Sequence, residues 1–381
     1  MTALFTSAHE AFRQQVRRYV DEQLTPRVDA WEQEETLPRE MFRDLGRAGL
    51  LGLTYPPEYG GRGLDFGYNV VLAEELPRCH ALGVALSVFA QAHFVPPLLG
   101  LLGTEEQKRT YLAPLIRGEL IGAVASSEPT GGSDIVRSIR CSAVDAGDAW
   151  VINGEKKYIT NSPIADFVIT LLRTRPEPSI NSLSLIIVPT DTPGFRVKAA
   201  LRKLGVRSSP TGWLEYRDCR VPKSLTLGKP NLAYHYVARN ILEERLIGGV
   251  CAVAFGELVL RETIAYLRGR EAFGTTLAQL QAIRHRLAEM AAELESSRRF
   301  VHSVCASYRD GTVETKEICM IKFHVFELVQ RVVERCLQLH GASGFLEESW
   351  IARAYRDVRV LSIGGGPSEL MKDLVAAYLR L

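Results

Sequence analysis

The spacing of apolar residues changes twice along the chain, and this change limits the folds that the chain can adopt. From Ser7 to about Gly118 apolar residues recur every three or four positions, which is typical of amphipathic helices. From about Leu120 to Gly228 short runs with strand character replace them, and helical spacing returns after Pro230. Helices and strands in separate blocks predict an α+β fold with segregated layers, not a doubly wound sheet.

Particular segments carry these predictions. In the middle block, Asn153-Gly154 lies between two runs with strand character, Trp150–Ile152 and Lys156–Thr160, and predicts a two-residue type I′ hairpin turn. Further predicted strands are Phe167–Leu172, Leu183–Val188 and Trp213–Tyr216. In the last block, two helices are predicted from Leu287, Met290, Ala291 and Leu294, and from Ile318, Ile321, Val325, Leu328 and Val332.

Charge and length exclude some classes of protein. The 381 residues include 46 basic and 44 acidic side chains, for a formal net charge of +2. Nucleic-acid binding domains are strongly basic or carry a basic stripe, so we expect no nucleic-acid partner. Nor does this balance favour an anionic membrane surface. An ordinary apolar fraction of 46% excludes wholesale disorder.

The cysteines and the apolar segments point to the interior of a cell. The seven cysteines show no CxxC spacing and there is no HExxH, so we expect reduced, buried thiols and no metal site. Met1–Glu10 lacks the pattern of a signal peptide, and we expect a cytoplasmic protein. The longest apolar stretch, Leu86–Gly103, contains Gln91, His93 and two prolines, which predicts a kinked core helix rather than a membrane span.

Two glycine-containing segments could bind a ligand. Gly61 and Gly63, followed by Gly67, lack GxGxxG spacing and follow a loop instead of a strand, so we interpret them as a plain turn. Ser126–Asp134 combines four hydroxyls with adjacent glycines that would let backbone N–H groups approach a ligand closely. By itself this segment fits a ligand loop and an ordinary β-turn equally well.

A set of short segments, in a fixed order, resembles the acyl-CoA dehydrogenase family. They are Tyr55–Gly63, Ser126–Asp134, Asn153–Asn161, Leu204–Ser209, Val221-Pro222, Glu244-Arg245, Arg270–Gly274 with Gln281, Gln338–Phe345 and Tyr355–Asp357. Each is weak alone, but their common register over nearly the whole chain makes coincidence negligible. The resemblance implies an N-terminal all-α domain at 1–119, a β-barrel-like middle domain at 120–229 and a C-terminal four-helix bundle at 230–381. It also implies FAD as cofactor and an acyl thioester as substrate.

The resemblance assigns cofactor and substrate positions residue by residue. The implied flavin-binding residues are Val124, Ser126, Ser127, Ser133, Tyr158, Ile159, Thr160, Arg270, Phe273, Gln281, Gln338, Gly341, Ala342, Pro367, Ser368 and Glu369. Arg270, Phe273 and Gln281 match positions that reach the adenine and pyrophosphate end of FAD from a neighbouring subunit. The forked donor group of an arginine suits phosphate oxygens. Ser133, Arg245 and Gly366 are implied to contact the thioester.

The position of the catalytic base departs from the pattern of many family members. The family's reaction removes the α-proton of the thioester while the β-hydrogen leaves as hydride to flavin N5. Many members carry the base as a late Glu, where this chain has Gly365. A branch that includes isovaleryl-CoA and long-chain acyl-CoA dehydrogenases has Glu directly before the Arg of the first C-terminal helix, as Glu244 precedes Arg245 here. We therefore expect Glu244 to be the base and the backbone N–H of Gly365 to donate to the thioester oxygen.

Other readings stay open at this point. Glu243 and Glu244 could be ordinary charged residues of an exposed helix. Pro367 stands where the family usually has Thr, and Ala342 replaces a usual Gly. These departures are compatible with a flavin oxidase or N-oxygenase on the same fold, or with a non-catalytic partner subunit that has a degenerate site. The resemblance further implies a homo-oligomer, a dimer or tetramer, an acyl-CoA or acyl-carrier-protein substrate, and an electron-transfer flavoprotein as acceptor.

Overall fold

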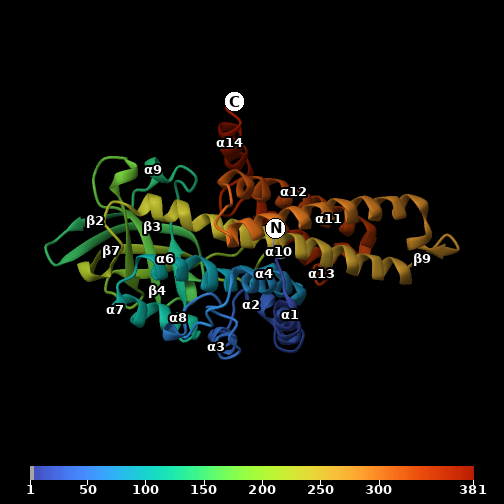
Figure 1. Cartoon of the computed structure of the whole chain (residues 1–381), viewed down its shortest axis with the longest axis horizontal. Coiled ribbons are helices and arrows are strands. Elements are labelled where there is room, and N and C mark those ends of the chain that lie inside the picture. Colours follow the sequence, from blue (N-terminus) through green and yellow to red (C-terminus); the bar gives the residue numbers. More distant parts are fainter. Residues whose placement is uncertain (1–3) are drawn as a thin grey trace.

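The computed structural model describes residues 4–381. Helices occupy both ends of the chain, and a sheet lies between them in sequence and at one end of the molecule in space (Figure 1). The N-terminal helices are α1 Ser7–Tyr19, α2 Val28–Glu34, α3 Arg39–Arg47, α4 Phe66–Glu75, α5 Leu82–Phe89, α6 Val95–Leu102, α7 Glu105–Gln107 and α8 Ala113–Ile116. The predicted α+β fold with segregated layers is confirmed.

The middle part forms one eight-stranded sheet with the order β6-β7-β3-β2-β4-β5-β8, and β1 pairs with β4. Its strands are β1 Gly122–Ala125, β2 Ser142–Asp145, β3 Ala149–Thr160, β4 Phe167–Arg173, β5 Leu183–Pro189, β6 Phe195–Ala200, β7 Thr211–Pro222 and β8 Thr226–Leu227, with the short helix α9 Ile135–Ser138 after β1. β4 is central and almost wholly apolar because both of its faces are buried.

The predicted hairpin turn at Asn153-Gly154 is wrong. Both residues lie inside β3, which pairs antiparallel with β7 on either side of them, with a register shift between Ile152 and Gly154. Gly154 has a φ of +139°, and a β-carbon there would lie 2.6 Å from the Cα of Cys141. The Asn-Gly pair therefore forms a bulge in a long strand, because a partner strand distant in sequence overrides the local turn preference.

The C-terminal part is a helical bundle built on α10 and α12. Its elements are α10 Ala233–Gly269, the hairpin β9 Glu271–Ala272 and β10 Thr275–Thr276, α11 Gln281–Arg309, α12 Thr315–His340, α13 Trp350–Val358 and α14 Ser368–Tyr378. α10 has 37 residues, which at 1.5 Å per residue makes it about 55 Å long. It runs from the sheet to the hairpin at the opposite end of the molecule (Figure 1).

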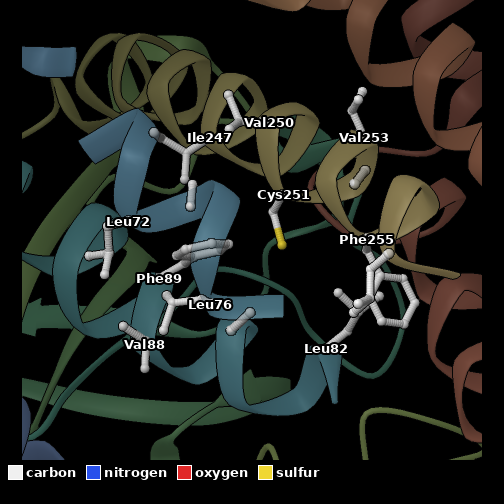
Figure 2. Close-up of a cluster of buried hydrophobic side chains, with 14 of the residues drawn as sticks. Leu72, Leu76, Leu82, Val88, Phe89, Ile247, Val250, Cys251, Val253 and Phe255 are labelled. Carbon is white, nitrogen blue, oxygen red and sulfur yellow. The ribbon is translucent and has the colours of Figure 1, made fainter. Parts of the chain in front are cut away.

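The main core lies between the N-terminal helices and α10. Figure 2 shows Leu72, Leu76 and Phe89 facing Ile247 and Cys251 across this contact, and all five are buried. Because α10 is packed on one side by these helices and on the other by α12, its middle section is apolar nearly all round. The N-terminal helices therefore hold the middle section of α10 in a fixed position.

The long apolar stretch is a kinked core helix, as predicted. α5 and α6 are joined by a π-helical turn at Ala90–Phe94, just before Pro96-Pro97. By length and composition Leu82–Leu102 could cross a membrane, but 83% of its tested window is buried inside the molecule. The glycine run at Gly61 is a loop, and all seven cysteines are buried free thiols.

Candidate active site

The first group of predicted cofactor residues lies where β1 ends and β3 ends. Val124 is in β1, and Ser126 and Ser127 follow it. The backbone N–H of Lys157 donates to the carbonyl of Ser127 at 2.9 Å, which places this loop beside the last residues of β3. A β-carbon on Gly132 would lie 3.2 Å from Ser127 Oγ, so the loop folds back on itself as it approaches Ser133.

The end of β3 contains a second bulge that presents Tyr158. The pairing of β3 with β7 shifts register between Lys157 and Ile159, and Tyr158 between them has a φ of +67°. Its side chain is 60% exposed, whereas Ile159 is buried in the core of the sheet. A bulge re-aims a side chain in this way. Tyr158 and Thr160 can thus contact a ligand with their side chains, and Ile159 only with its backbone.

These residues fit the flavin of FAD. Within residues 4–381 the hydroxyls of Ser126, Ser127, Ser133 and Thr160 have no hydrogen-bond partner. They are free donors on the loop after β1 and at the end of β3, two segments that the hydrogen bond between Lys157 and Ser127 brings together. The rim of an isoalloxazine carries carbonyl and nitrogen acceptors around a flat aromatic face, and such a ring needs donors at its edge and an aromatic or apolar contact on its face.

A buried ion pair lies beneath this loop, and the sequence pattern does not predict it. Lys156 Nζ lies 2.8 Å from Glu128 Oε1 and also donates to the carbonyl of Ser126 at 3.0 Å. Glu128 in turn accepts the backbone N–H groups of Arg140 and Cys141. Both side chains of the pair are almost fully buried. The pair therefore fixes the loop that carries the predicted flavin contacts, although in sequence it looks like two ordinary surface charges.

The second group brings Glu244 and Gly365 together. Glu244 lies on α10, and a β-carbon built on Gly365 would be 3.3 Å from its Oε1. Arg245 Nε donates to the carbonyl of Gly365 at 2.9 Å. The carboxylate of Glu244 thus lies where a side chain at position 365 would begin. The two positions at which the resemblance implies a catalytic base, 244 and 365, therefore lie side by side in this structure.

The loop before α14 requires its glycines. Gly365 and Gly366 have φ values of +66° and +99°, which L side chains rarely adopt. A β-carbon on Gly366 would also lie 2.9 Å from Arg245 Nη2 and 3.0 Å from Met371 Cε. Arg245 is buried and packs closely against this loop. Arg245, Gly365 and Gly366 therefore form one tightly packed unit.

Burial changes the acidity of Glu244. Desolvation raises its pKa to about 7, and the positive charges of Arg245 and Lys322 oppose this rise. Lys322 lies on α12 and was also missed in the sequence. Its position in the sequence could have shown that Lys322 is buried. It stands four residues after Ile318 and three before Val325, in the buried stripe of α12. A lysine in an apolar stripe is unusual enough to mark a special environment.

Glu243 is engaged elsewhere. Its carboxylate accepts a hydrogen bond from Tyr308 Oη at 2.9 Å and lies 3.3 Å from His93 Nδ1. His93 comes from the π-helical turn between α5 and α6, and Tyr308 comes from α11. The adjacent carboxylate therefore ties three helices together on a different side of α10, away from Gly365.

The residues around the start of α14 have separate environments. Pro367 precedes the helix with extended backbone, at φ −65° and ψ 157°. Ser368 is its first residue and is buried, and Glu369 is exposed. A proline is tolerated here because the first N–H groups of a helix have no partner within it.

The third group lies at the far end of the bundle. Arg270, Phe273, Gln281, Gln338, Gly341 and Ala342 are exposed or nearly so, and Phe273 is 93% exposed. The ends of α10 and α12 meet there, because Tyr266 stacks on His340 at 4.2 Å. Arg270 is about 38 Å along α10 from Glu244. Within one chain the structure therefore separates this group from the other two.

Two motifs seen in the sequence form a contact between domains. Asp357 on α13 accepts the backbone N–H groups of Val206 and Leu82. A β-carbon on Gly205 would lie 2.3 Å from the carbonyl oxygen of Arg356, so only glycine fits. Burial, followed by the charge of Glu32, raises the pKa of Asp357 to about 7. This contact fixes the middle domain against the bundle. Among residues 4–381 no group of three or more potential ligands is arranged to hold a metal ion.

The comparisons with known proteins cover the whole fold. Residues 6–119, 123–219 and 234–379 match the N-terminal, middle and C-terminal domain models of acyl-CoA dehydrogenase. The chain is 34% identical over 378 residues to the long-chain specific acyl-CoA dehydrogenase of Rattus norvegicus, covering 99% of this chain and 87% of that protein. It is 32% identical to the isovaleryl-CoA dehydrogenase of Oryza sativa, covering 99% and 92%.

Solved structures agree with these sequence matches. An acyl-CoA dehydrogenase from Geobacillus kaustophilus superimposes with a TM-score of 0.95 at 34% identity, covering 99% of both chains. A glutaryl-CoA dehydrogenase from Mycobacterium smegmatis in complex with FADH2 superimposes with a TM-score of 0.92 at 28% identity. Together with the free donors after β1 and at the end of β3, these matches establish that the chain belongs to the acyl-CoA dehydrogenase family and is an FAD-dependent oxidoreductase.

Proposed function

We propose that this enzyme converts an acyl thioester to the trans-2-enoyl thioester with Glu244 as the base that takes the α-proton. The observation that carries the proposal is the position of the Glu244 carboxylate, 3.3 Å from where a side chain at residue 365 would begin. Relatives named long-chain and isovaleryl acyl-CoA dehydrogenases support it, since these names belong to the branch for which the resemblance implies a Glu directly before the Arg, as Glu244 precedes Arg245 here.

The surroundings of Glu244 suit a base that works near neutral pH. With a pKa of about 7, the carboxyl is partly ionised near neutral pH and basic enough to accept a carbon-bound proton. The bound FAD would supply the acceptor for the β-hydrogen, which leaves as hydride. The protein must therefore hold the α-carbon at Glu244 and keep water out of the site.

The glycine loop can stabilise the charge that develops on the thioester oxygen. Arg245 holds the carbonyl of Gly365, and in a trans peptide the N–H of Gly366 points in the opposite direction. We assign the backbone N–H groups of Gly365 and Gly366 as donors to the thioester oxygen. Preorganised backbone donors of this kind stabilise an enolate-like oxygen without any side chain.

We further propose a homo-oligomer in which the exposed end of the bundle completes the cofactor site of another subunit. Arg270 and Phe273 project from the hairpin about 38 Å along α10 from Glu244, too far to serve the same site. A 93% exposed phenylalanine beside an arginine fits an interface with an aromatic, phosphate-bearing ligand.

An electron-transfer flavoprotein is our proposed acceptor for the electrons. A chain that matches this one with a TM-score of 0.94 at 27% identity comes from a structure described as the electron transferring flavoprotein of Acidaminococcus fermentans. We propose coenzyme A as the carrier of the acyl group. The alternative is an acyl group bound to a carrier protein, and the two kinds of thioester can be compared directly as substrates.

The proposal is tested by anaerobic mixing of the FAD-loaded enzyme with a panel of saturated acyl-CoA and acyl-carrier-protein thioesters. We expect one class to bleach the flavin absorbance and to yield the 2-enoyl thioester. A flavin that no thioester bleaches would overturn the proposal. Bleaching followed by fast reoxidation with O₂ and formation of H₂O₂ would favour an oxidase instead.

A further inference from the structure

We infer that Lys322 is a positioning residue for the proposed base: its buried ammonium group, behind Gly365, keeps the Glu244 carboxyl ionised and therefore ready to take a proton. The inference rests on the proposed role of Glu244 and deepens it. Lys322 does not touch the substrate in this scheme. It acts only through the charge of its neighbour.

The geometry places Lys322 and Glu244 beside the same glycine, Gly365. A β-carbon built on Gly365 would lie 3.3 Å from Glu244 Oε1 and 3.5 Å from Lys322 Cε. The two side chains come from α10 and α12, which pack along each other. Because residue 365 has no side chain, the space that a β-carbon would fill is bordered by both the carboxylate of Glu244 and the end of the Lys322 side chain.

The structure holds the lysine in place with few interactions of its own. Lys322 is 1% exposed, and its Nζ donates to the carbonyl of Leu361 at 2.5 Å. The ring of Phe326 lies 4.4 Å from Nζ. Within residues 4–381 this is its one hydrogen bond, and the ion pairs contain no carboxylate within 4.0 Å of it. A buried ammonium without a paired carboxylate is costly, so its presence beside the base calls for a reason other than stability.

The charges around Glu244 favour this reading. Arg245 and Lys322 are the two cations that face it, from α10 and α12, and the glycine loop contributes no titratable group. Cys319 on α12 lies near Arg245, and Glu243 is bound by His93 and Tyr308. Arg245 donates to the carbonyl of Gly365, and Lys322 donates to the carbonyl of Leu361. Lys322 is thus a second cation, beside Arg245, whose charge favours the ionised form of Glu244.

Burial lowers the pKa of Lys322 to about 7, and the charge of Arg245 adds to this effect while Glu244 opposes it. Burial raises the pKa of Glu244 to a similar value. The ammonium of Lys322 and the carboxylate of Glu244 therefore stabilise each other, and each group ionises most readily when the other is charged. Removing the lysine charge must raise the pKa of the carboxyl, because an opposite charge nearby favours the ionised form.

The test compares the pH dependence of flavin reduction in Lys322→Met, Lys322→Gln and Lys322→Arg. In the Met and Gln variants we expect the midpoint of the rate to move at least about one pH unit upwards, so that the rate falls about fivefold or more near pH 7, about tenfold or more well below it, and recovers near pH 9. Lys322→Arg retains a charge and should stay closer to the wild type. Lys316→Met, an exposed lysine of the same helix, is the matched control and should leave the midpoint unchanged.

Structural damage alone would not reproduce this result. Lys322→Gln keeps a donor for the Leu361 carbonyl, and FAD content with melting temperature identifies variants that have not folded. A midpoint that is unchanged in folded, FAD-loaded Lys322→Gln would overturn the inference.

A measurement without substrate separates this inference from the proposed function. Infrared difference titration can follow the Glu244 carboxyl directly, with Glu244→Gln as the blank. We expect its titration to move to higher pH in Lys322→Gln, even if no thioester reduces the flavin. An unchanged titration would overturn the role of Lys322, whereas a flavin that no thioester bleaches would overturn only the proposed reaction.

Discussion

The carboxylate of Glu244 occupies the space into which a side chain at Gly365 would project, since a β-carbon built on Gly365 would lie 3.3 Å from Glu244 Oε1. One residue is in the first third of the long helix α10, and the other is in the loop before the last helix. Under the proposed function, Glu244 presents from α10 the carboxylate that position 365 lacks. This relationship also makes the assignment of the base testable.

Replacing Glu244 by Gln should abolish proton abstraction while FAD stays bound. General-base catalysis typically contributes about 10²–10⁴-fold, so we expect flavin reduction to slow by at least that factor. The matched control is Glu243→Gln, because that neighbouring carboxylate is bound by Tyr308 and His93 away from Gly365. Stopped-flow absorbance measures both. Equal losses in the two variants would contradict the assignment.

Moving the carboxylate should recover part of the activity. In Glu244→Gly with Gly365→Glu, the new side chain would start at the space that the old carboxylate leaves. We expect at least about tenfold faster flavin reduction than in Glu244→Gly alone. Recovery should be incomplete, because a non-glycine residue at φ +66° costs about 1 kcal/mol or more. No recovery in a folded, FAD-loaded double variant would argue against convergence of the two positions.

The raised pKa of Glu244 should also be visible in stability. Between the unfolded value of about 4.5 and the folded value of about 7, the native carboxyl binds more protons than the unfolded one. This group therefore lowers the free energy of unfolding as the pH rises from 5 to 8. Glu244→Gln removes this contribution, so its melting temperature relative to wild type should increase by a few degrees over that range. A constant difference would show that the pKa is not raised.

The buried pair beneath the flavin loop should matter more than a surface pair. Lys156→Met leaves the Glu128 carboxylate buried without its cation, which typically costs about 3–5 kcal/mol of unfolding free energy. Lys198→Met breaks the more exposed pair with Glu155 on the same sheet and should cost about 1 kcal/mol or less. Denaturant unfolding of the two variants measures the difference. We expect weaker FAD binding only in Lys156→Met, and equal effects would contradict a bracing role.

Much of the fold could be predicted because its signals are local. The helical spacing of Ile318, Ile321 and Val325 and the apolar runs at 167–172 and 183–188 appear in α12, β4 and β5. The motif register predicted the family correctly. The hairpin at Asn153-Gly154 failed because turn preference is a weak local term, and pairing with β7 along the whole of β3 outweighs it.

The sequence by itself determined the order of helices and strands, the family and the identity of the residues available for chemistry, since these depend on local spacing and on motifs along the chain. Only the tertiary structure decided that Glu244, Gly365 and Lys322 meet, and that Arg270 lies far from them. Contacts between distant segments, and the loss of water that moves the pKa of Glu244 and of Lys322 towards neutrality, arise only when α10, α12 and the glycine loop pack together.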